Sequence, residues 1–487
     1  MLVKKIYKPL LLLTLVFQGC NDFEDLNTNP NEPTSVSSGV LFSSAIRNSA
    51  QTQANESFLL GNNIAQLSAK TLRAEVDFYG WNAFPTVWEG FYESLTDVQQ
   101  VIDISIETGD TATQGAAIIY KSWIYSVLTN AYGDIPYSEA MKGLEANFTP
   151  AYDSQEAIYA DLLSSLEQAV GMLSNGGSVT GDLLYDGDTQ KWVRFANSLR
   201  LRLLMYQSGK QDVSAAFASI VNSGNIINSN DNQAAVTFLN SFPNQFPTIP
   251  LKQGDFDAVA ISKAAVTVME DLKDPRLSRY ARPDNEDFDA PVFTGVENGV
   301  GGQTGSRLGL AYFNYPGQIT ADQMGINYAE GLIMTYSEVC FLVAEGIAKG
   351  WVSGDIATEY KKGIQASHDY YQVNYAPYGW NSFEDYYDNS GVAFAETEDI
   401  WKQKWLSLYF SGLEPYFELR RWYNEVNGWD GLSFVSAPIG TNLNNYELPS
   451  RFLYPGQEQS LNNANYQEAS SRYAGGNTIN GKMWILQ

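Results

Sequence analysis

Residues 120–140 read YKSWIYSVLTNAYGDIPYSEA, and this stretch decides the fold class. Its apolar side chains recur at i, i+3, i+4, i+7, i+8 and i+11, a spacing that gathers them on one face of an α-helix. Gly133 stands where a left-handed residue would end the helix, and Pro136 prevents its continuation. The stretch therefore predicts a buried helix followed by a tightly specified exit loop. The apolar face consists of Tyr120, Trp123, Ile124, Val127, Leu128 and Ala131.

The same helical period recurs along most of the chain. Helix follows helix, so we expect antiparallel helix pairs and a mainly α fold. No strict 34-residue repeat is visible, and a repeat architecture does not follow from the period alone. The predicted helices are 41–70, 85–107, 114–132, 151–173 and 189–208 in the first half, and 334–350, 355–371, 396–410 and 414–425 in the second.

The segment between these two groups has a different composition. Residues 225–333 are rich in Asn, Gly and Pro and contain one predicted helix, 257–272. The glycine-rich run 295–309 lacks the preceding strand and following helix of a nucleotide-binding fingerprint, so it predicts a flexible surface loop. Residues 426–487 predict an irregular C-terminal part.

The N-terminus has the pattern of an export signal. Residues 1–20, MLVKKIYKPLLLLTLVFQGC, combine early lysines with an apolar run and end at Cys20. The run is too short to span a bilayer and is typical of a secretory signal. Its end resembles the bacterial lipobox, so we expect residues 1–19 to be a signal peptide and Cys20 to be lipidated, with an unmodified secreted form as the alternative. Residues 20–39, dense in turn formers, predict a lipidated tether.

Composition excludes several kinds of site. The 487 residues carry a formal net charge of -25, which argues against nucleic acid as a partner. One histidine, His368, rules out a multi-histidine zinc site, and two cysteines, Cys20 and Cys340, rule out a disulfide framework. Cys340 falls in a helical apolar run and is predicted to be buried. We predict no cofactor and no metal site, since no EF-hand loop is present, although so acidic a chain leaves a bound cation open.

Two other classes of secreted protein compete with a simple binding protein. A helical glycoside hydrolase needs two carboxylates at a set separation, one of them with a raised pKa. A substrate-binding lipoprotein of an ABC importer would alternate buried strands with helices across two lobes, which this chain does not do. We therefore expect no enzyme activity. The neighbouring acids considered for hydrolysis are Glu75 with Asp77, Glu384 with Asp385, and Glu414 with Glu418.

Aromatic residues outside the helical faces are the candidate ligand-binding groups. A flat ring can stack on a sugar or a peptide side chain while losing little rotamer entropy. Three clusters fall in predicted loops, within 78–84, 312–316 and 370–387, whereas the tryptophans on helix faces are predicted to be core. The core tryptophans are Trp88, Trp123, Trp192, Trp401 and Trp405. The ligand-binding candidates are Tyr79, Trp81, Phe84, Tyr312, Phe313, Tyr315, Tyr378 and Trp380.

Several motifs, in this order, resemble the SusD/RagB family of nutrient-binding outer-membrane lipoproteins, in its SusD-like branch. The resemblance covers almost the whole chain. Its motifs are NTNPNEPT at 27–34, GDIPYSEA at 133–140, KWVRFANSLRLR at 191–202, DPR at 274–276, QKWLSLY at 403–409, GLEPYFELRRW at 412–422 and RFLYPGQE at 451–458.

The resemblance implies a fold, a location and a partner. The fold would be one domain, 40–487, with tetratricopeptide-like stacked helix pairs at about 40–224 and 334–425 and a loop-rich region inserted at about 225–333. The protein would be anchored by Cys20 on the outer face of the outer membrane, as the acidic residues 21–25 also suggest. It would deliver a glycan or a peptide to a SusC-like TonB-dependent transporter. The family's ligand residues lie in variable loops, so none transfers to this chain.

Overall fold

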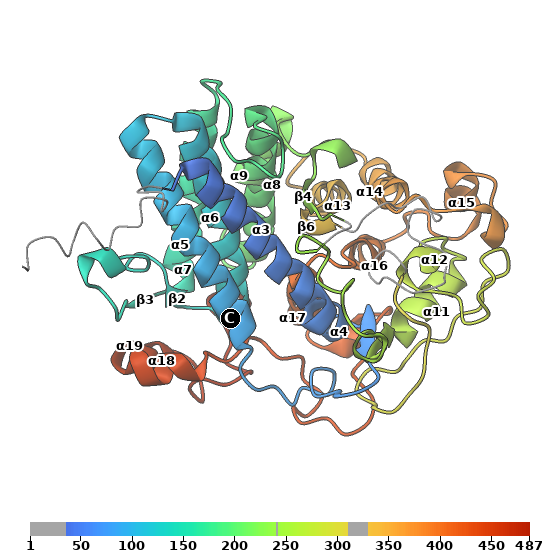
Figure 1. The fold of residues 1–487 in the computed structure, drawn as a ribbon. Coiled ribbons are helices and arrows are strands. Elements are labelled where there is room, and N and C mark those ends of the chain that lie inside the picture. The colour runs from blue at the N-terminus through green and yellow to red at the C-terminus, as the bar shows by residue number, and fades with distance from the viewer. Residues whose placement is uncertain (1–35, 240–241, 310–329) are drawn as a thin grey trace, which may run out of the picture.

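Two groups of α-helices, one from each half of the chain, form the scaffold in a computed structural model that describes residues 36–239, 242–309 and 330–487 (Figure 1). The predicted signal peptide, Cys20 and most of the tether lie outside these residues, as do Tyr312, Phe313 and Tyr315. In the first group, α3 packs on α5, α5 on α6, α6 on α7 and α7 on α8. Its helices are α3 (Ser38–Glu56), α5 (Pro85–Thr108), α6 (Thr111–Tyr132), α7 (Gln155–Leu173), α8 (Thr189–Gln207) and α9 (Ser214–Ser223).

In the second group, α13, α14 and α16 pack on one another, and α14 and α15 lie on the side of the molecule opposite α5 in Figure 1. The mainly α fold is confirmed. The helices of this group are α13 (Tyr336–Ala348), α14 (Ile356–Tyr370), α15 (Phe383–Asn389), α16 (Thr397–Ser407) and α17 (Glu414–Glu425). Shorter helices are α4 (Asn62–Ile64), α10 (Gln253–Phe256), α11 (Lys263–Asp271), α12 (Leu277–Tyr280), α18 (Gly456–Leu461) and α19 (Asn463–Ser471).

Three short antiparallel strand pairs are present in the described residues, and two of them, β1–β5 and β4–β6, connect segments that are far apart in the sequence. β1 pairs with β5, β2 with β3, and β4 with β6, the last with a bulge between Ala234 and Ala235. The strands are β1 (Ser68–Lys70), β2 (Ile135–Pro136), β3 (Tyr152–Asp153), β4 (Ala234–Thr237), β5 (Val259–Ile261) and β6 (Glu330–Met334).

Local sequence explains most helix ends. Pro85 occupies the first turn of α5, and Gly109 ends it with φ +72°. Asp110 caps α6 by accepting a hydrogen bond from the Thr113 amide at 3.0 Å. Helix α17 begins and ends where its pattern predicts, at Glu414 and Glu425.

Three predicted helices need correction, because part of each forms a strand. The helix predicted at 41–70 ends at Ile64, after a π-helical turn, and is followed by β1. The one predicted at 257–272 begins with β5, and the one at 334–350 starts only after β6. These segments pair with strands far away in the sequence, which a helical period does not reveal.

Aromatic side chains fill the core. All five tryptophans predicted to be core are buried, and Trp123, Trp192 and Trp405 are fully so. The prediction for Cys340 is also confirmed, since its side chain is buried in α13. Gly61 is required by close packing, because a methyl group there would overlap the carbonyl of Gly412.

The glycine-rich run 295–309 is not the free surface loop that its composition predicts. Single bridges join Arg307 to Ala260, Val296 to Ser262, and Leu308 to Ala281. The run is therefore held against β5 and its neighbours by backbone hydrogen bonds. Its glycines allow this close approach.

Buried ion pairs join the two groups of helices to each other and helices within the second group. Arg202 on α8 contacts Glu338 on α13 at 2.6 Å. Glu418 on α17 contacts Lys404 on α16 at 2.8 Å and Arg421 at 2.7 Å. Since unpaired buried charges are costly, these pairs fix the register between the helices. Within the described part of the chain, none of the helices combines the length and the apolar character needed to cross a bilayer.

Candidate ligand-binding site

The first aromatic cluster packs into the core. Tyr79 is 2% exposed and Trp81 is 8% exposed. The Trp81 ring lies 5.4 Å from the ring of Phe452 and 5.8 Å from that of Tyr416, and its Nε1 donates to the carbonyl of Val76 at 2.9 Å. Although both rings lie outside the predicted helical faces, Tyr79 and Trp81 are part of the core. The residues that cover them lie more than 300 positions away, so the sequence pattern gave no sign of it.

Phe84 lies at the edge of the same cluster. Its half-buried ring is 4.9 Å from that of Phe452 and 5.6 Å from that of Trp81. It also precedes Pro85, the first residue of α5, so its backbone position is set by the helix start. Its role in the structure is to close the aromatic core at this corner.

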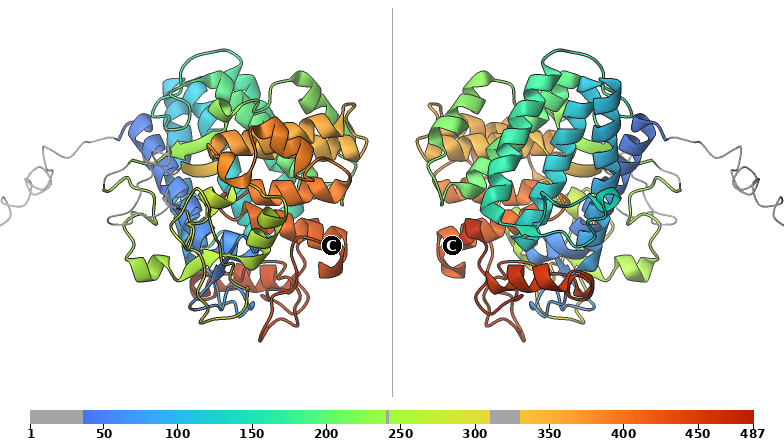
Figure 2. Two further views of the ribbon diagram at one scale, coloured as in Figure 1. Left: turned by 90° about the vertical axis from the view of Figure 1, so that its right-hand side faces the viewer. Right: turned by 90° about the vertical axis from the view of Figure 1, so that its left-hand side faces the viewer.

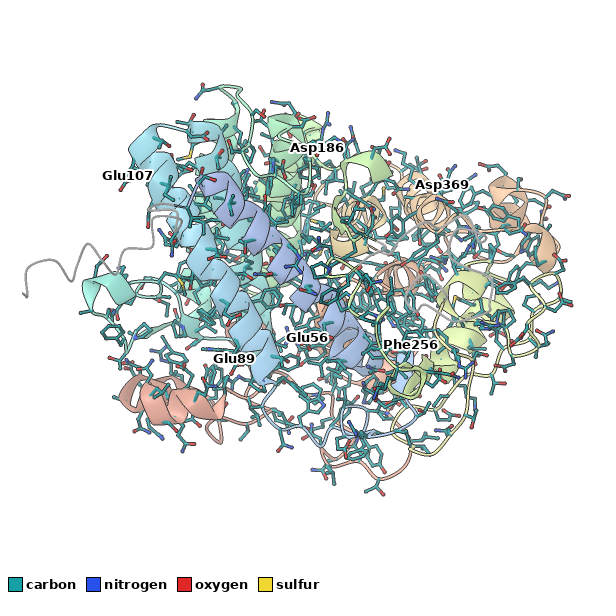
Figure 3. The ribbon with its side chains drawn as sticks, viewed as in Figure 1. Glu56, Glu89, Glu107, Asp186, Phe256 and Asp369 are labelled. Atoms are coloured by element: carbon teal, nitrogen blue, oxygen red, sulfur yellow. The ribbon has the colours of Figure 1, made fainter. Side chains whose placement is uncertain are left out.

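Buried charges hold the loop that carries this cluster. The Asp77 carboxylate accepts hydrogen bonds from the Lys70 amide at 2.8 Å and from Asn298 Nδ2 at 3.2 Å. Burial raises the pKa of Asp77 to about 7 and that of Glu56, at the end of α3 (Figure 3), also to about 7. Burial lowers the pKa of Lys70 to about 8. This corner is thus a packed structural element, in which burial shifts the pKa values of all three groups in the direction that favours their neutral forms.

The second described cluster lies on the loop-rich side of the molecule and remains partly accessible. The Tyr378 hydroxyl is 2.6 Å from the Ser278 hydroxyl, and Trp380 Nε1 donates to the carbonyl of Lys273 at 2.9 Å. The ammonium group of Lys273 lies 5.9 Å from the centre of the Trp380 ring. The Tyr378 ring is therefore pinned to α12 and the Trp380 ring to the segment before it, so both are preorganised.

A cavity of about 510 Å³ opens beside Tyr378. Its walls come from α11, α12, the loop before Thr294 and the loop that carries Tyr378. Apolar rings and one residue of each charge face it, a mixture that suits a small ligand with both apolar and polar faces. The wall residues used below are Glu270, Lys273, Leu277, Phe293 and Tyr378.

A buried polar network supports this wall from beneath. Arg276 Nη2 contacts Asp274 at 2.5 Å and Gln403 Oε1 at 2.6 Å, and Tyr386 donates to Asp274 at 3.0 Å. Burial alone would raise the pKa of Asp274, but the Arg276 guanidinium and His368 outweigh it and hold the pKa well below its usual range.

His368 belongs to the same network. Its Nε2 lies 3.5 Å from Asp274, and its Nδ1 lies 3.0 Å from the Tyr375 hydroxyl. Burial lowers the pKa of this imidazole, which favours its neutral form. The contacts give His368 a positioning role beneath the Tyr375–Trp380 loop. Sequence reasoning missed this network, although the DPR motif at 274–276 marked two of its members.

The acid pairs considered for hydrolysis occupy other environments. Glu414 and Glu418 are buried, with Arg202 3.4 Å from the former and Lys404 2.8 Å from the latter. Asp77 is buried as described above, whereas Glu75 and Glu384 are exposed. In the described residues no group of three or more His, Cys, Asp or Glu side chains is arranged to hold a metal ion.

A family model described as SusD-like, starch-binding and associating with the outer membrane, matches residues 30–455. A search of functionally curated proteins returned no match.

Solved structures share the fold over nearly the full length. A SusD homologue from Bacteroides fragilis NCTC 9343 is 24% identical, with a TM-score of 0.77 over 93% of this chain and 100% of that one. A chitin-binding protein is 25% identical, with a TM-score of 0.74 over 92% of this chain and 99% of that one. A chitin-binding SusD homologue from Flavobacterium johnsoniae is 19% identical, with a TM-score of 0.75 over 92% and 98%.

Proposed function

This chain belongs to the SusD-like family, and from that membership we propose that it binds a neutral oligosaccharide in the cavity beside Tyr378, whose loop also carries the pinned ring of Trp380. The observation that carries the proposal is the pinned, partly accessible Tyr378 ring on the wall of the cavity. A ring held in place by its own hydroxyl loses little entropy when a sugar stacks on it.

Size and charge also favour this class of ligand. A volume of about 510 Å³ falls within the range of small-molecule sites. The net charge of -25 disfavours acidic polysaccharides. The family description names starch, and the relative that is 25% identical is a chitin-binding protein, so glucose and N-acetylglucosamine oligomers are the first ligands to test.

We also propose where the protein acts. Residues 1–19 would be removed, Cys20 would be lipidated, and the protein would face outward from the outer membrane. It would pass its ligand to a SusC-like TonB-dependent transporter without changing it chemically. The support is the order of family motifs, the lipobox-like end of the signal and the family's association with the outer membrane.

Ligand titration tests the binding site. Wild-type protein, Trp380→Ala and Tyr378→Ala are titrated calorimetrically with maltotriose, chitotriose and an unrelated tripeptide. Loss of one stacking ring should weaken sugar binding about tenfold, which corresponds to about 1.4 kcal/mol. Phe148→Ala is the matched control, since this ring is 75% exposed and does not line the cavity. Binding of the tripeptide alone, or equal sugar binding by all variants, would refute the proposal.

Location and partner need an experiment in the native organism. The wild-type protein and a Cys20→Ser variant are labelled with an alkyne fatty acid and purified from outer membranes. We expect label and a stoichiometric β-barrel transporter with the wild type, and no label with the variant. Copurification of an inner-membrane permease would support the importer alternative instead.

A further inference from the structure

A second cavity, of about 560 Å³, lies on the helical side of the protein. It is bounded by α5, α6, α7 and the exit loop that carries the GDIPYSEA motif. These helices face the viewer in the right-hand view of Figure 2 and lie across the molecule from α11 and α12 in Figure 1. The cavity is therefore separate from the one beside Tyr378.

Charges of both signs line this cavity. Lys121 projects from α6, the middle helix, and its Nζ donates to Gln99 Oε1 on α5 at 2.8 Å. Asp103 on α5 and Asp161 on α7 also line the wall. Burial lowers the pKa of Lys121, while Asp161 and Asp103 act in the opposite direction. Among the described residues, no carboxylate lies within ion-pair distance of Lys121, so these charges stay separated.

Two tyrosines add apolar surface to the wall. The centres of the Tyr125 and Tyr137 rings lie 4.6 Å apart, and the ring planes meet at 71°. The Tyr137 hydroxyl, from the GDIPYSEA motif, donates to Asp161 at 2.5 Å, which fixes its ring. The hydroxyl of Tyr125 is buried and has no hydrogen-bond partner among the described residues. A buried polar group without a partner is rare in folded proteins and draws attention to the space beside it.

The mixture of charges selects a class of ligand. An anion would meet four carboxylates, and a cation would meet two ammonium groups. These groups belong to Asp103, Glu145, Asp153 and Asp161, and to Lys121 and Lys142. A neutral hydroxyl compound avoids both conflicts, because each hydroxyl can accept a hydrogen bond from Lys121 and donate one to a carboxylate. The tyrosine rings can cover its apolar face. We propose that this cavity is a second binding site, for a short neutral saccharide, on the helical scaffold.

Methionine methyl NMR tests the site directly. Met141 lines the cavity, and its methyl signal is assigned with Met141→Leu. Titration with maltotriose or chitotriose should shift this signal saturably in the wild type and equally in Trp380→Ala. Lys121→Met should weaken binding at least tenfold. Tyr137→Phe keeps the ring but frees it from Asp161 and should weaken binding a few-fold, whereas Lys402→Met on α16 should leave binding unchanged. Circular dichroism verifies that each variant is folded.

The outcomes separate this inference from the proposed function. An unshifted Met141 methyl in the wild type, or equal binding by wild type and Lys121→Met, would overturn the second site. A larger response to glucuronate or putrescine than to the neutral sugars would overturn its ligand class. Failure of the first site gives a different result. In that case Trp380→Ala would bind sugar with the same calorimetric profile as the wild type.

Discussion

Arg202 and Glu338 form a two-point ion pair inside the protein, with Nε–Oε1 and Nη2–Oε2 distances of 2.6 Å. Their side chains are 2% and 1% exposed. Arg202 also lies 3.4 Å from Glu414, so one guanidinium compensates two carboxylates from different helices. Burial raises the pKa of Glu414 to about 7.

This arrangement predicts that neutralising Arg202 and neutralising Glu338 lower the free energy of unfolding by different amounts. Arg202→Met leaves two buried carboxylates without their partner and should lower the free energy of unfolding by about 3–5 kcal/mol. Glu338→Gln should lower the free energy of unfolding by a smaller amount, because Glu414 can still pair with Arg202. Urea unfolding followed by circular dichroism gives both values. Equal losses would show that Glu414 does not share the charge.

Glu56 predicts a defined dependence of stability on pH. Its pKa is raised to about 7, so between about 4.5 and 7 the folded state holds a proton that the unfolded state has lost. Stability from this group is therefore present at low pH and falls as pH rises through that window. The change should amount to about 3 kcal/mol.

The matched variant for this effect is Glu56→Gln, which keeps an acceptor for the Thr86 hydroxyl, 3.0 Å away in the wild type. The free energies of unfolding of wild type and variant are measured by urea titration from pH 5 to pH 8. As the pH rises, the wild type should lose stability relative to the variant. A difference that does not vary with pH would contradict the raised pKa.

Gly133 should be far less replaceable than Gly109, although both have a positive φ. It has φ +83° and ψ -118°, and an added methyl group would overlap the Tyr473 hydroxyl, which accepts a hydrogen bond from the Asp134 amide at 2.8 Å. Gly109, with φ +72°, has no neighbour within 4 Å of such a methyl. Gly109→Ala should lower the free energy of unfolding by about 1–2 kcal/mol, and Gly133→Ala should lower it by clearly more. Thermal unfolding of both variants checks the order.

Tyr378 allows the ring and its hydroxyl to be tested separately. Tyr378→Phe removes the contact with Ser278 but keeps the ring, so sugar binding should weaken only a few-fold. Tyr378→Ala removes both and should weaken it about tenfold. Calorimetry with the better of the two trisaccharides distinguishes them. If Phe and Ala are equally damaging, the hydroxyl is the group that matters.

The sequence predicted elements whose stabilising contacts are local. Helix α17 has its proline and its acidic first turn within four residues, and its limits were predicted correctly. Strand β1 depends on pairing with β5, about 190 positions later, and was read as part of a helix. Long-range pairing of this kind leaves no periodic signal in a single segment.

The same distinction applies to the candidate site. The burial of Trp81 depends on Phe452 and Tyr416, and its loop position gave no hint of them. Trp380 was predicted from composition, but the groups that hold it, Lys273 and the network around Asp274, come from a different segment. Which loop aromatics stay accessible is therefore decided by tertiary packing.

The charge sharing at Arg202 also bears on the order in which the chain is made. A ribosome completes α8 long before it adds Glu338 and Glu414, so the guanidinium must stay hydrated while the first helices assemble. The N-terminal helices thus await a counter-charge supplied by the last third of the protein. Nascent chains that stop short of residue 414 should remain protease-sensitive throughout, and an independently folded N-terminal half is not expected.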